Sequence, residues 1–279
     1  MADVQVTAAP ASRPTVPQAY VALVRSRVAA QAAYRTSFAV ELGSQVLLVL
    51  IEFIEIYVVF HQVDRLGGFD YAEVAVMYGL ASAGFGIADM VVGHGDRLPT
   101  YVRQGTFDSM MLRPLSALGQ LVTSDFAMRR LGRVLTGIVV LAVALHVADI
   151  DWTLARVALV VLTPVAGAII FSAVFIATST IGFWVVEGME FANAFTYGGN
   201  TMTQYPMTIF PREVLKGLTF LVPVAFVNWY PCLYLLDRPD PFGMPSWFAV
   251  LSPAVALLTL AVAGLAWRTG VRHYTSTGS

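Results

Sequence analysis

Residues 157–186 read VALVVLTPVAGAIIFSAVFIATSTIGFWVV, and no side chain among them is charged. A helix needs roughly 20 mainly apolar residues to cross the hydrocarbon core of a bilayer, so this stretch is long enough to span a membrane. Comparable stretches lie on both sides of it in the sequence. They predict further spanning helices at Ser37–Phe60, Ala72–Val92, Val134–Val147 (with its helix beginning earlier, near Leu121) and Trp247–Trp267.

The composition also indicates a bilayer environment. Of the 279 residues, 57% are hydrophobic and 13% are charged, whereas about 25% of the residues in a soluble domain are charged. A chain with so little charge cannot cover a globule with polar surface. The sequence therefore predicts an all-α membrane protein. Its one cysteine, Cys232, permits no internal disulfide.

The basic residues predict which side of the membrane each loop faces, because cytoplasmic loops carry an excess of Lys and Arg. With the N-terminus inside, the cytoplasmic segments hold Arg13, Arg25, Arg27, Arg35, Arg97, Arg103, Arg113, Arg129, Arg130, Arg133, Arg268 and Arg272. Only Arg65, Arg156 and Arg238 then fall outside, and Arg212 and Lys216 are not assigned. We therefore expect a multi-pass inner-membrane protein with both termini in the cytoplasm.

Both ends of the chain are predicted to lie outside the bilayer. Residues 1–18 contain three prolines and no apolar segment of the signal-peptide kind, which indicates a disordered cytoplasmic lead-in. Residues 19–36 are expected to form a cytoplasmic or interfacial helix, and residues 269–279 a cytoplasmic tail. The transmembrane domain then covers residues 37–268.

Two interpretations are open for the region between residues 190 and 236. By hydropathy, 213–236 is the better fifth span, because 190–208 is rich in polar residues. However, 213–236 contains Pro223, Asn228 and Pro231, and non-helical backbone at membrane depth is tolerated only where protein or a wet cavity satisfies it. The prolines favour a broken hairpin over 211–236 that enters from outside, with 190–208 as a short polar fifth span.

Motifs for catalysis are missing from the sequence. Lys216 is the only lysine, and no G-x-x-x-x-G-K-[ST] surrounds it, so the chain lacks the phosphate-binding loop of P-loop ATPases. The four histidines form no metal-ligand spacing. We therefore expect neither an enzyme nor a cofactor on this chain, and no nucleic-acid partner. A channel, a structural membrane subunit and an intramembrane enzyme using carboxylates stay as alternative functions.

The cytoplasmic loop at residues 96–120 contains the run YVRQGTFDSMMLRPLS, Tyr101 to Ser116. Gly105 can interrupt one helix, and Thr106 is a suitable N-cap for a second. Asp108 then lies in the first turn, where the helix dipole favours an anion. The residue pair Arg113-Pro114 tends to end the helix. The run predicts a short amphipathic helix on the inner face of the membrane.

This run resembles the loop after the second span in bacterial ABC-2 type permeases, in the branch that includes viologen and multidrug exporters. The C-terminal sequence GVRHYTSTGS, from Gly270, and the proline-rich stretch 210–231 resemble the same branch. The resemblance covers nearly the whole chain from about Tyr20. It implies six transmembrane helices, a cytoplasmic coupling helix and an external re-entrant hairpin.

The resemblance also implies partners and residue roles. Two separate ATPase subunits, which hold the ATP and Mg, would dock on a pair of permease chains that are identical or homologous. By motif match, coupling to the ATPase would fall on Gly105, Phe107, Asp108, Leu112, Arg113 and Pro114. The expected function is a permease subunit of an ATP-binding-cassette exporter for small amphipathic or cationic compounds, in contact with membrane lipid.

Four polar residues share one stripe of the first predicted span. Glu41, Gln45, Glu52 and Glu55 lie within about 40° of Glu41 on a helical wheel. A carboxylate near the bilayer centre costs at least about 2.5–3.5 kcal/mol on insertion scales, so the stripe should face the protein interior, a partner or water. It either pairs with Arg or Tyr, or lines a path for cationic cargo. Asp89 in the second span is a further candidate, and 190–208 offers a similar stripe with Tyr197, Asn200, Thr201 and Gln204.

Overall fold

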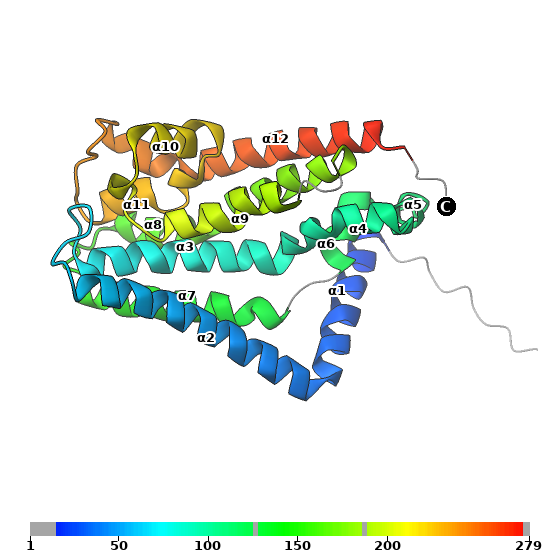
Figure 1. The fold of residues 1–279 in the computed structure, drawn as a ribbon, viewed down its shortest axis with the longest axis horizontal. Helices are drawn as coiled ribbons and strands as arrows, with labels where there is room; N and C mark the ends of the chain where they lie inside the picture. The colour runs from blue at the N-terminus through cyan, green and yellow to red at the C-terminus, as the bar shows by residue number, and fades with distance from the viewer. Residues whose placement is uncertain (1–14, 125–127, 186–188, 276–279) are drawn as a thin grey trace, which may run out of the picture.

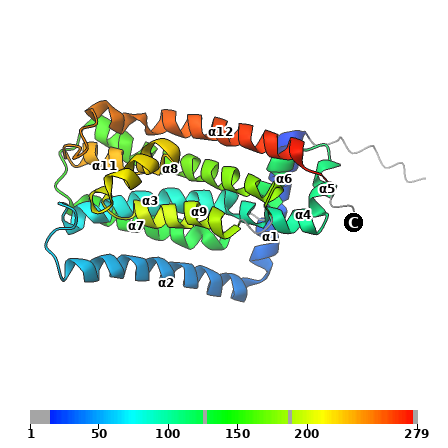
Figure 2. The ribbon, with the colours of Figure 1, turned by 45° about the horizontal axis from the view of Figure 1, so that its top comes forward.

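The computed structural model describes residues 15–124, 128–185 and 189–275. Within these residues, the regular structure is helical apart from one isolated bridge between Leu66 and Phe69. The long helices lie along one another in a bundle, as Figures 1 and 2 show. These are α2 (Arg35–Phe60), α3 (Tyr71–Val92), α7 (Leu131–Val147), α8 (Leu154–Thr180), α9 (Met189–Thr203) and α12 (Ser252–His273).

Helix α3 forms the centre of the bundle and packs mainly on α7 and α8. Its first turn is fixed by a capping box, in which Asp70 and Glu73 each accept a hydrogen bond from the backbone N–H of the other, at 3.0 and 2.9 Å. Small residues let α3 and α7 approach closely. A Cβ added at Gly79 would lie 2.7 Å from Leu141 Cα. Glycine therefore sets this helix–helix distance, as small residues commonly do in membrane bundles.

Membrane-spanning length is met by four helical segments of the described chain: Arg35–Phe60, Tyr71–Arg103, Leu154–Phe183 and Ser246–His273. Helix α7 is apolar but shorter. A fifth span is reached if the segments Arg212–Leu221 and Val224–Leu235, bent by 83° relative to one another, count as one. The fold is therefore an all-helical multi-pass membrane protein, with a bent, re-entrant-like pair near Pro223.

The bent pair and α9 bear on the ambiguous region of the sequence. The prediction of a broken segment is confirmed, because the helices after Pro211 stop and turn at Pro223. The pair consists of α10 (Arg212–Lys216), the π-helix η5 (Gly217–Leu221), η6 (Val224–Phe226) and α11 (Trp229–Leu235). Helix α9 lies inside the bundle, next to α8 and α3.

The start of α7 differs from the prediction of a helix beginning near Leu121. Leu121 belongs to a separate helix, α6 (Ala117–Ser124), and α7 begins at Leu131 after the short turn η2 (Met128–Arg130). The separation has a physical reason, because Arg130 and Arg133 enter the bundle and form ion pairs there. The count of cytoplasmic arginines treated Arg130 and Arg133 as loop charges, but in the structure both are paired inside the bundle.

The two ends of the bundle are built differently (Figure 1). One end carries α1 (Val16–Ala33), η1 (Gly93–Arg97), α4 (Leu98–Arg103), α5 (Thr106–Met111), α6 and the end of the described chain at residue 275. The opposite end carries α10, α11 and the loops after α2 and α7. Helix α1 begins at Val16, slightly before the predicted boundary at residue 19. The predictions for residues 1–14 and 276–279 concern residues outside the described ranges.

Ion pairs close the end that carries α11. Arg238 holds the buried Glu73 carboxylate with two hydrogen bonds, from Nε to Oε1 at 2.7 Å and from Nη2 to Oε2 at 3.0 Å. Arg156 at the start of α8 lies 3.3 Å from Asp237. Because Asp237 and Arg238 follow α11 directly, these contacts tie the bent pair to α3 and α8. Bidentate geometry makes the Glu73 contact the stronger of the two.

Candidate functional site

An ion pair lies inside the bundle between α3 and the turn before α7. Arg130 Nη1 lies 2.5 Å from Asp89 Oδ1 and donates a second hydrogen bond to the Asp89 carbonyl oxygen at 2.7 Å. The Tyr197 hydroxyl of α9 donates to the same carboxylate at 3.2 Å. The two charged side chains are only 15% and 7% exposed. A buried pair of this kind holds three elements in one relative position, since neither charge can remain inside alone.

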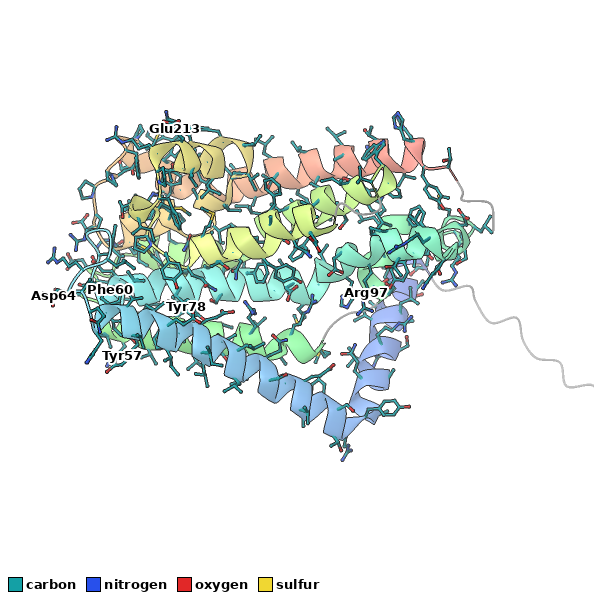
Figure 3. All side chains as sticks on the ribbon, viewed as in Figure 1. Tyr57, Phe60, Asp64, Tyr78, Arg97 and Glu213 are labelled. Carbon is teal, nitrogen blue, oxygen red and sulfur yellow. The ribbon has the colours of Figure 1, made fainter. Side chains whose placement is uncertain are left out.

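A second polar contact forms further along the same helices. Arg133 Nη2 lies 3.1 Å from Glu52 Oε1, which joins α7 to α2. Tyr78 of α3 and Gln204, next to the end of α9, donate to Glu52 Oε2 at 3.3 and 3.2 Å. Tyr78 also bonds the Val49 carbonyl oxygen at 3.0 Å, and Figure 3 shows it between α3 and α2. Glu52 is therefore held by side chains from three other parts of the bundle.

Phe85 connects the two contacts. Its ring packs edge-on against Tyr197, with centroids 5.6 Å apart, and Arg133 lies over it at 5.5 Å from the centroid. A guanidinium over an aromatic face is attracted by the ring quadrupole. We call the seven polar side chains of this arrangement the polar ladder: Glu52, Tyr78, Asp89, Arg130, Arg133, Tyr197 and Gln204.

The ladder brings together some of the predicted path residues and leaves others apart. Glu52, Tyr197 and Gln204 are engaged in it, whereas Glu41 and Glu55 are exposed on α2. Gln45 is half-buried, close to Gly132 of α7. Asn200 is buried, and its side-chain oxygen has no hydrogen-bond partner in the part of the chain that the structure describes. The stripe on α2 thus divides into the paired Glu52 and two exposed carboxylates, Glu41 and Glu55, that form no ion pair with any described residue.

The predicted coupling loop folds into two short helices at the end of the bundle opposite α11. Gly105 joins them with φ +66°, a left-handed conformation that favours glycine. Gly105 itself takes the N-cap position, and Thr106 is the first helical residue, so the prediction of Thr106 as N-cap is wrong. Asp108 lies in the first turn of α5, as predicted.

Phe107 lies in an aromatic cluster beneath α5. Its side chain is completely buried and packs against Phe183, Trp267 and Tyr274, with ring centroids 5.3, 6.3 and 5.1 Å away. These partners come from η3 (Ile181–Phe183), α12 and the segment after it. We call the four rings the aromatic clamp. Phe107 therefore anchors the loop to its own bundle, and in this conformation it is not available to a partner protein.

A hydrogen bond ties the same helix to the C-terminal segment. The Tyr274 hydroxyl donates to Asp108 Oδ1 at 2.9 Å. Partial burial and the Asp108 carboxylate raise the pKa of Tyr274 to about 12, so the hydroxyl keeps its proton and remains a donor at neutral pH. Together with the clamp, this bond attaches α5 to both α8 and α12.

The far side of the loop faces away from the bundle. Leu112 is 88% exposed and Met111 is 41% exposed, and Ser109, Arg113 and Pro114 are also exposed. We call these five residues the exposed tip. The loop behind them is fixed by Gln120, whose side-chain amide donates to the carbonyl oxygens of Met110 and Leu115 at 2.7 and 3.1 Å. The tip is thus a small, partly apolar surface on a rigid support.

Six residues of the ladder and the clamp were not among the predicted site residues. Tyr78, Arg130 and Arg133 complete the ladder, and Phe183, Trp267 and Tyr274 complete the clamp. A signal existed for the two arginines, because they stand at the edge of an apolar segment with the i, i+3 spacing of one helix face. No local pattern marks Tyr78 among the aromatic residues of its helix.

Comparison with known proteins identifies the family. The family model described as "ABC-2 family transporter protein" matches residues 46–278. The chain belongs to this family. As an ABC-2 family protein it is a membrane permease component of a transporter, without an ATPase domain of its own. No curated protein and no solved structure shows a significant match to it. Among the described residues, this ABC-2 protein has no cluster of three or more His, Cys, Asp or Glu suited to a metal ion.

Proposed function

We propose that this ABC-2 protein is the permease subunit of an exporter for small amphipathic or cationic compounds, driven by two separate ATPase subunits. The observation that carries the proposal is the exposed tip on its buried support. Leu112 and Arg113 face outward, while Phe107 fixes the helix from behind. Because its support is rigid, this surface can transmit a displacement caused by a partner protein to the rest of the bundle.

The route of that displacement is set by the contacts of α5. Phe107 touches Phe183 at the end of α8 and Trp267 of α12, and Asp108 is bonded to Tyr274. A displacement of the tip would therefore act on α8 and α12, which pack against each other. In this proposal, Gly105, Phe107 and Asp108 position the loop, and Leu112, Arg113 and Pro114 contact the ATPase.

The translocation path is proposed to lie along the polar stripe of α2. In its spanning stretch, 11% of α2 is buried, compared with 83% for the segment Tyr71–Arg103, so a large face of α2 is left uncovered by the described residues. Glu41 and Glu55 lie exposed on α2, while Gln45, Glu52, Tyr197, Asn200 and Gln204 continue the polar surface inward. A second permease chain, identical or homologous, would enclose this surface. Free carboxylates on it favour cations.

The proposed topology has six spans, α2, α3, α7, α8, α9 and α12, with the termini and the tip in the cytoplasm. Support comes from the arginines, which concentrate in the segments at the end that carries α1 and α4–α6; Figure 3 labels one of them, Arg97. The opposite end is then external, with the bent pair as a re-entrant hairpin. This distribution follows the positive-inside rule.

Reconstitution with the cognate nucleotide-binding subunit tests the function. The purified permease alone should not hydrolyse ATP, and the complex should hydrolyse ATP in a vanadate-sensitive manner that a lipophilic cation stimulates. ATP turnover by the permease alone would contradict the proposal, and so would a complex with a single permease chain by native mass measurement.

Cysteine labelling tests the topology. A cysteine at Asp151 should react with an impermeant reagent in intact cells, whereas one at Ser109 should not; both sites are exposed. The native Cys232 is completely buried. Both cysteines are introduced into a Cys232→Ser background, so that any labelling comes from the introduced cysteine. External labelling at Ser109 would reverse the orientation and remove the docking proposal with it.

A further inference from the structure

A groove opens on the outer face of the bundle between α8, α12 and the bent pair. Its volume is about 730 Å³, within the range of about 300–1,000 Å³ typical of ligand sites. The lining is almost entirely apolar and includes Val174 and Ala177 of α8, Phe220 and Pro223 of the bent pair, and Leu258 and Val262 of α12. None of the polar ladder residues lines it, so the groove is separate from the proposed path.

The few hydroxyl groups in the wall are already satisfied. Thr178 donates to the Val174 carbonyl oxygen at 2.8 Å, and Thr259 donates to that of Val255 at 2.9 Å. Thr219 shares a hydrogen bond of 3.0 Å with the Tyr230 hydroxyl. A polar solute would find no free side-chain partner among them, and its own polar groups would lose their hydrogen bonds with water. The wall therefore suits a hydrocarbon chain.

The backbone at the mouth of the groove is irregular. Gly217–Leu221 forms a π-helix directly before Pro223, and such segments occur often at functional sites. At this point Phe220 and Leu221 are 66% and 80% exposed, so large apolar side chains project from the mouth. The second half of the bent pair packs on α8 and bonds to α12 through Ser252 and the Phe226 carbonyl oxygen, whereas α10 and the π-helix pack little against either helix, so the groove lies beside the first half of the pair.

A smaller cavity of about 180 Å³ adjoins the groove and shares Thr219 and Phe220 with it. Arg212 and Lys216 line this cavity. Arg212 forms no ion pair within the described part of the chain. Among the same residues, the one ion pair of Lys216 is an exposed contact of 3.2 Å with Glu213. Figure 3 labels Glu213 near α10. Exposed pairs of this type are weak, so both cations can bind an anionic group.

Carboxylates are also present around this cavity. Glu213 is exposed beside Lys216, and Asp240 accepts hydrogen bonds from the backbone N–H groups of Phe242 and Met244 at 3.3 and 2.8 Å. The Asp240 oxygens accept bonds within this turn, and the charged donors that line the cavity are Arg212 and Lys216. A headgroup with a phosphate fits this set, and a further positive group on it would find Glu213.

We infer that the groove and the cavity together bind one phospholipid. An acyl chain would fill the groove, and the headgroup phosphate would lie against Arg212 and Lys216. The lipid chain would then lie between α12 and the first half of the bent pair, Arg212–Leu221, which is bent by 83° from the second half. With the orientation proposed above, this is a lipid of the external leaflet.

The headgroup can be tested by native mass spectrometry of the delipidated protein. A phospholipid and a diacylglycerol with the same acyl chains are compared, because only the first carries a phosphate. The wild type should retain about one phospholipid and much less diacylglycerol. Since a basic residue near a lipid surface contributes about 1 kcal/mol, Arg212→Gln and Lys216→Gln should each weaken retention about fivefold. Arg65→Gln, in an exposed loop at the same end, should have no effect.

The groove is tested by a matched pair of substitutions on α12. Leu258 lines the groove, and Leu257 does not; the two are 64% and 65% exposed. Leu258→Trp should obstruct the acyl chain and reduce phospholipid retention, whereas Leu257→Trp should retain the lipid. Thermal unfolding of both variants shows whether each is folded.

Three results would overturn the inference. The first is equal retention of diacylglycerol and phospholipid with no effect of the charge substitutions, which would leave an unspecific apolar surface. The second is equal retention by the two tryptophan variants. The third is a disulfide-linked dimer formed by Leu258→Cys in the membrane, since a second copy of the chain would then cover the groove.

Discussion

Arg130, in the turn before α7, makes two hydrogen bonds to Asp89 of α3. Its Nη1 donates to the Asp89 carboxylate at 2.5 Å and to the Asp89 backbone carbonyl oxygen at 2.7 Å. Both side chains are almost entirely enclosed by the bundle. The pair therefore fixes the turn before α7 against α3 inside the bundle. Its first consequence concerns stability.

Asp89→Asn should destabilise the protein strongly, because it leaves the Arg130 guanidinium buried without its counter-charge. Breaking a buried pair by removing one partner costs about 3–5 kcal/mol. Thermal unfolding in detergent, followed by size-exclusion chromatography, measures the effect. As a control, Glu213→Gln breaks the exposed pair with Lys216, which is worth about 0–1 kcal/mol, and should leave the melting temperature unchanged.

Replacing both members of the pair is a second test of the same idea. Asp89→Leu combined with Arg130→Met removes both charges, and such apolar replacements are often neutral. The double variant should recover much of the stability that Asp89→Asn loses. Equal melting of Asp89→Asn and wild type would show that the pair does not hold the bundle together.

Substitutions in the coupling loop can distinguish residues that hold the loop on the bundle from residues that contact the ATPase. Phe107→Ala should lower thermal stability, because emptying a buried aromatic site costs about 3–5 kcal/mol. Leu112→Asp should leave stability unchanged, since Leu112 is 88% exposed, and should reduce copurification of the ATPase. Arg113→Glu should act like Leu112→Asp, because a reversed charge meets its former partner with repulsion.

Arg103→Glu provides the matched control for Arg113→Glu, because Arg103 is an exposed arginine on the neighbouring helix α4, outside the exposed tip. It should retain the ATPase. Normal ATPase binding by Leu112→Asp and Arg113→Glu would exclude the tip as the docking surface. Unchanged stability of Phe107→Ala would mean that the aromatic clamp does not anchor the loop.

Much of the fold was predictable from the sequence, because spans depend on long apolar runs. The prediction of Ala72–Val92 is close to α3, Tyr71–Val92, and the prolines of 213–236 correctly indicated a break. These features are local, and each residue contributes to them independently of its distant neighbours. The number of spans depends on α7 and α9, whose short or polar sequences do not establish a crossing on their own.

The contacts of the site were less predictable, because they join residues far apart in the sequence. The stripe on α2 was expected to face the interior, a partner or water, and pairing with Arg or Tyr was one of the two interpretations for it; Glu52 pairs with Arg133 and Tyr78. Its partner Arg133 was instead counted as a loop charge. Likewise, Phe107 was predicted as a contact for the ATPase, and only the packing of α12 and α8 around it shows that it is buried.

The bond between Tyr274 and Asp108 should contribute to coupling more than to assembly. Tyr274→Phe removes one hydrogen bond to a carboxylate, worth about 1.5–3 kcal/mol, and leaves the ring in the aromatic clamp. The ATPase should still copurify, while the ratio of transport to ATP hydrolysis falls. Tyr101→Phe is the control. A double-mutant cycle with Asp108→Asn should show that the two substitutions are not additive.

The pKa of Tyr274 sets the pH range of this bond. Because its folded-state pKa is raised to about 12, from about 10 in an unfolded chain, its contribution to stability is complete below pH 10. It is lost as the pH rises through the folded value. Between about pH 6 and 9, the difference in melting temperature between wild type and Tyr274→Phe should stay constant. A difference that disappears within this range would assign the effect to another group.

Glu52 and Glu55 share one face of α2 but differ in their surroundings, and this difference separates structure from transport. Glu52 accepts hydrogen bonds from Arg133, Tyr78 and Gln204. Glu52→Gln should therefore lower the melting temperature, by an amount below that of Asp89→Asn because the Glu52 side chain is 29% exposed. Glu55 is exposed and makes no ion pair within the described residues, so Glu55→Gln should change stability by less than about 0.5 kcal/mol.

Although Glu55→Gln should hardly change stability, it should change the response of the transporter to cargo. If the free carboxylate attracts cationic cargo, Glu55→Gln should raise the concentration of a lipophilic cation that half-maximally stimulates the ATPase. An exposed charge pair contributes up to about 1 kcal/mol, which corresponds to a factor of up to about five. Stimulation by an uncharged amphiphile should not change, because it makes no ionic contact. Identical cation responses of Glu55→Gln and wild type would remove Glu55 from the proposed path.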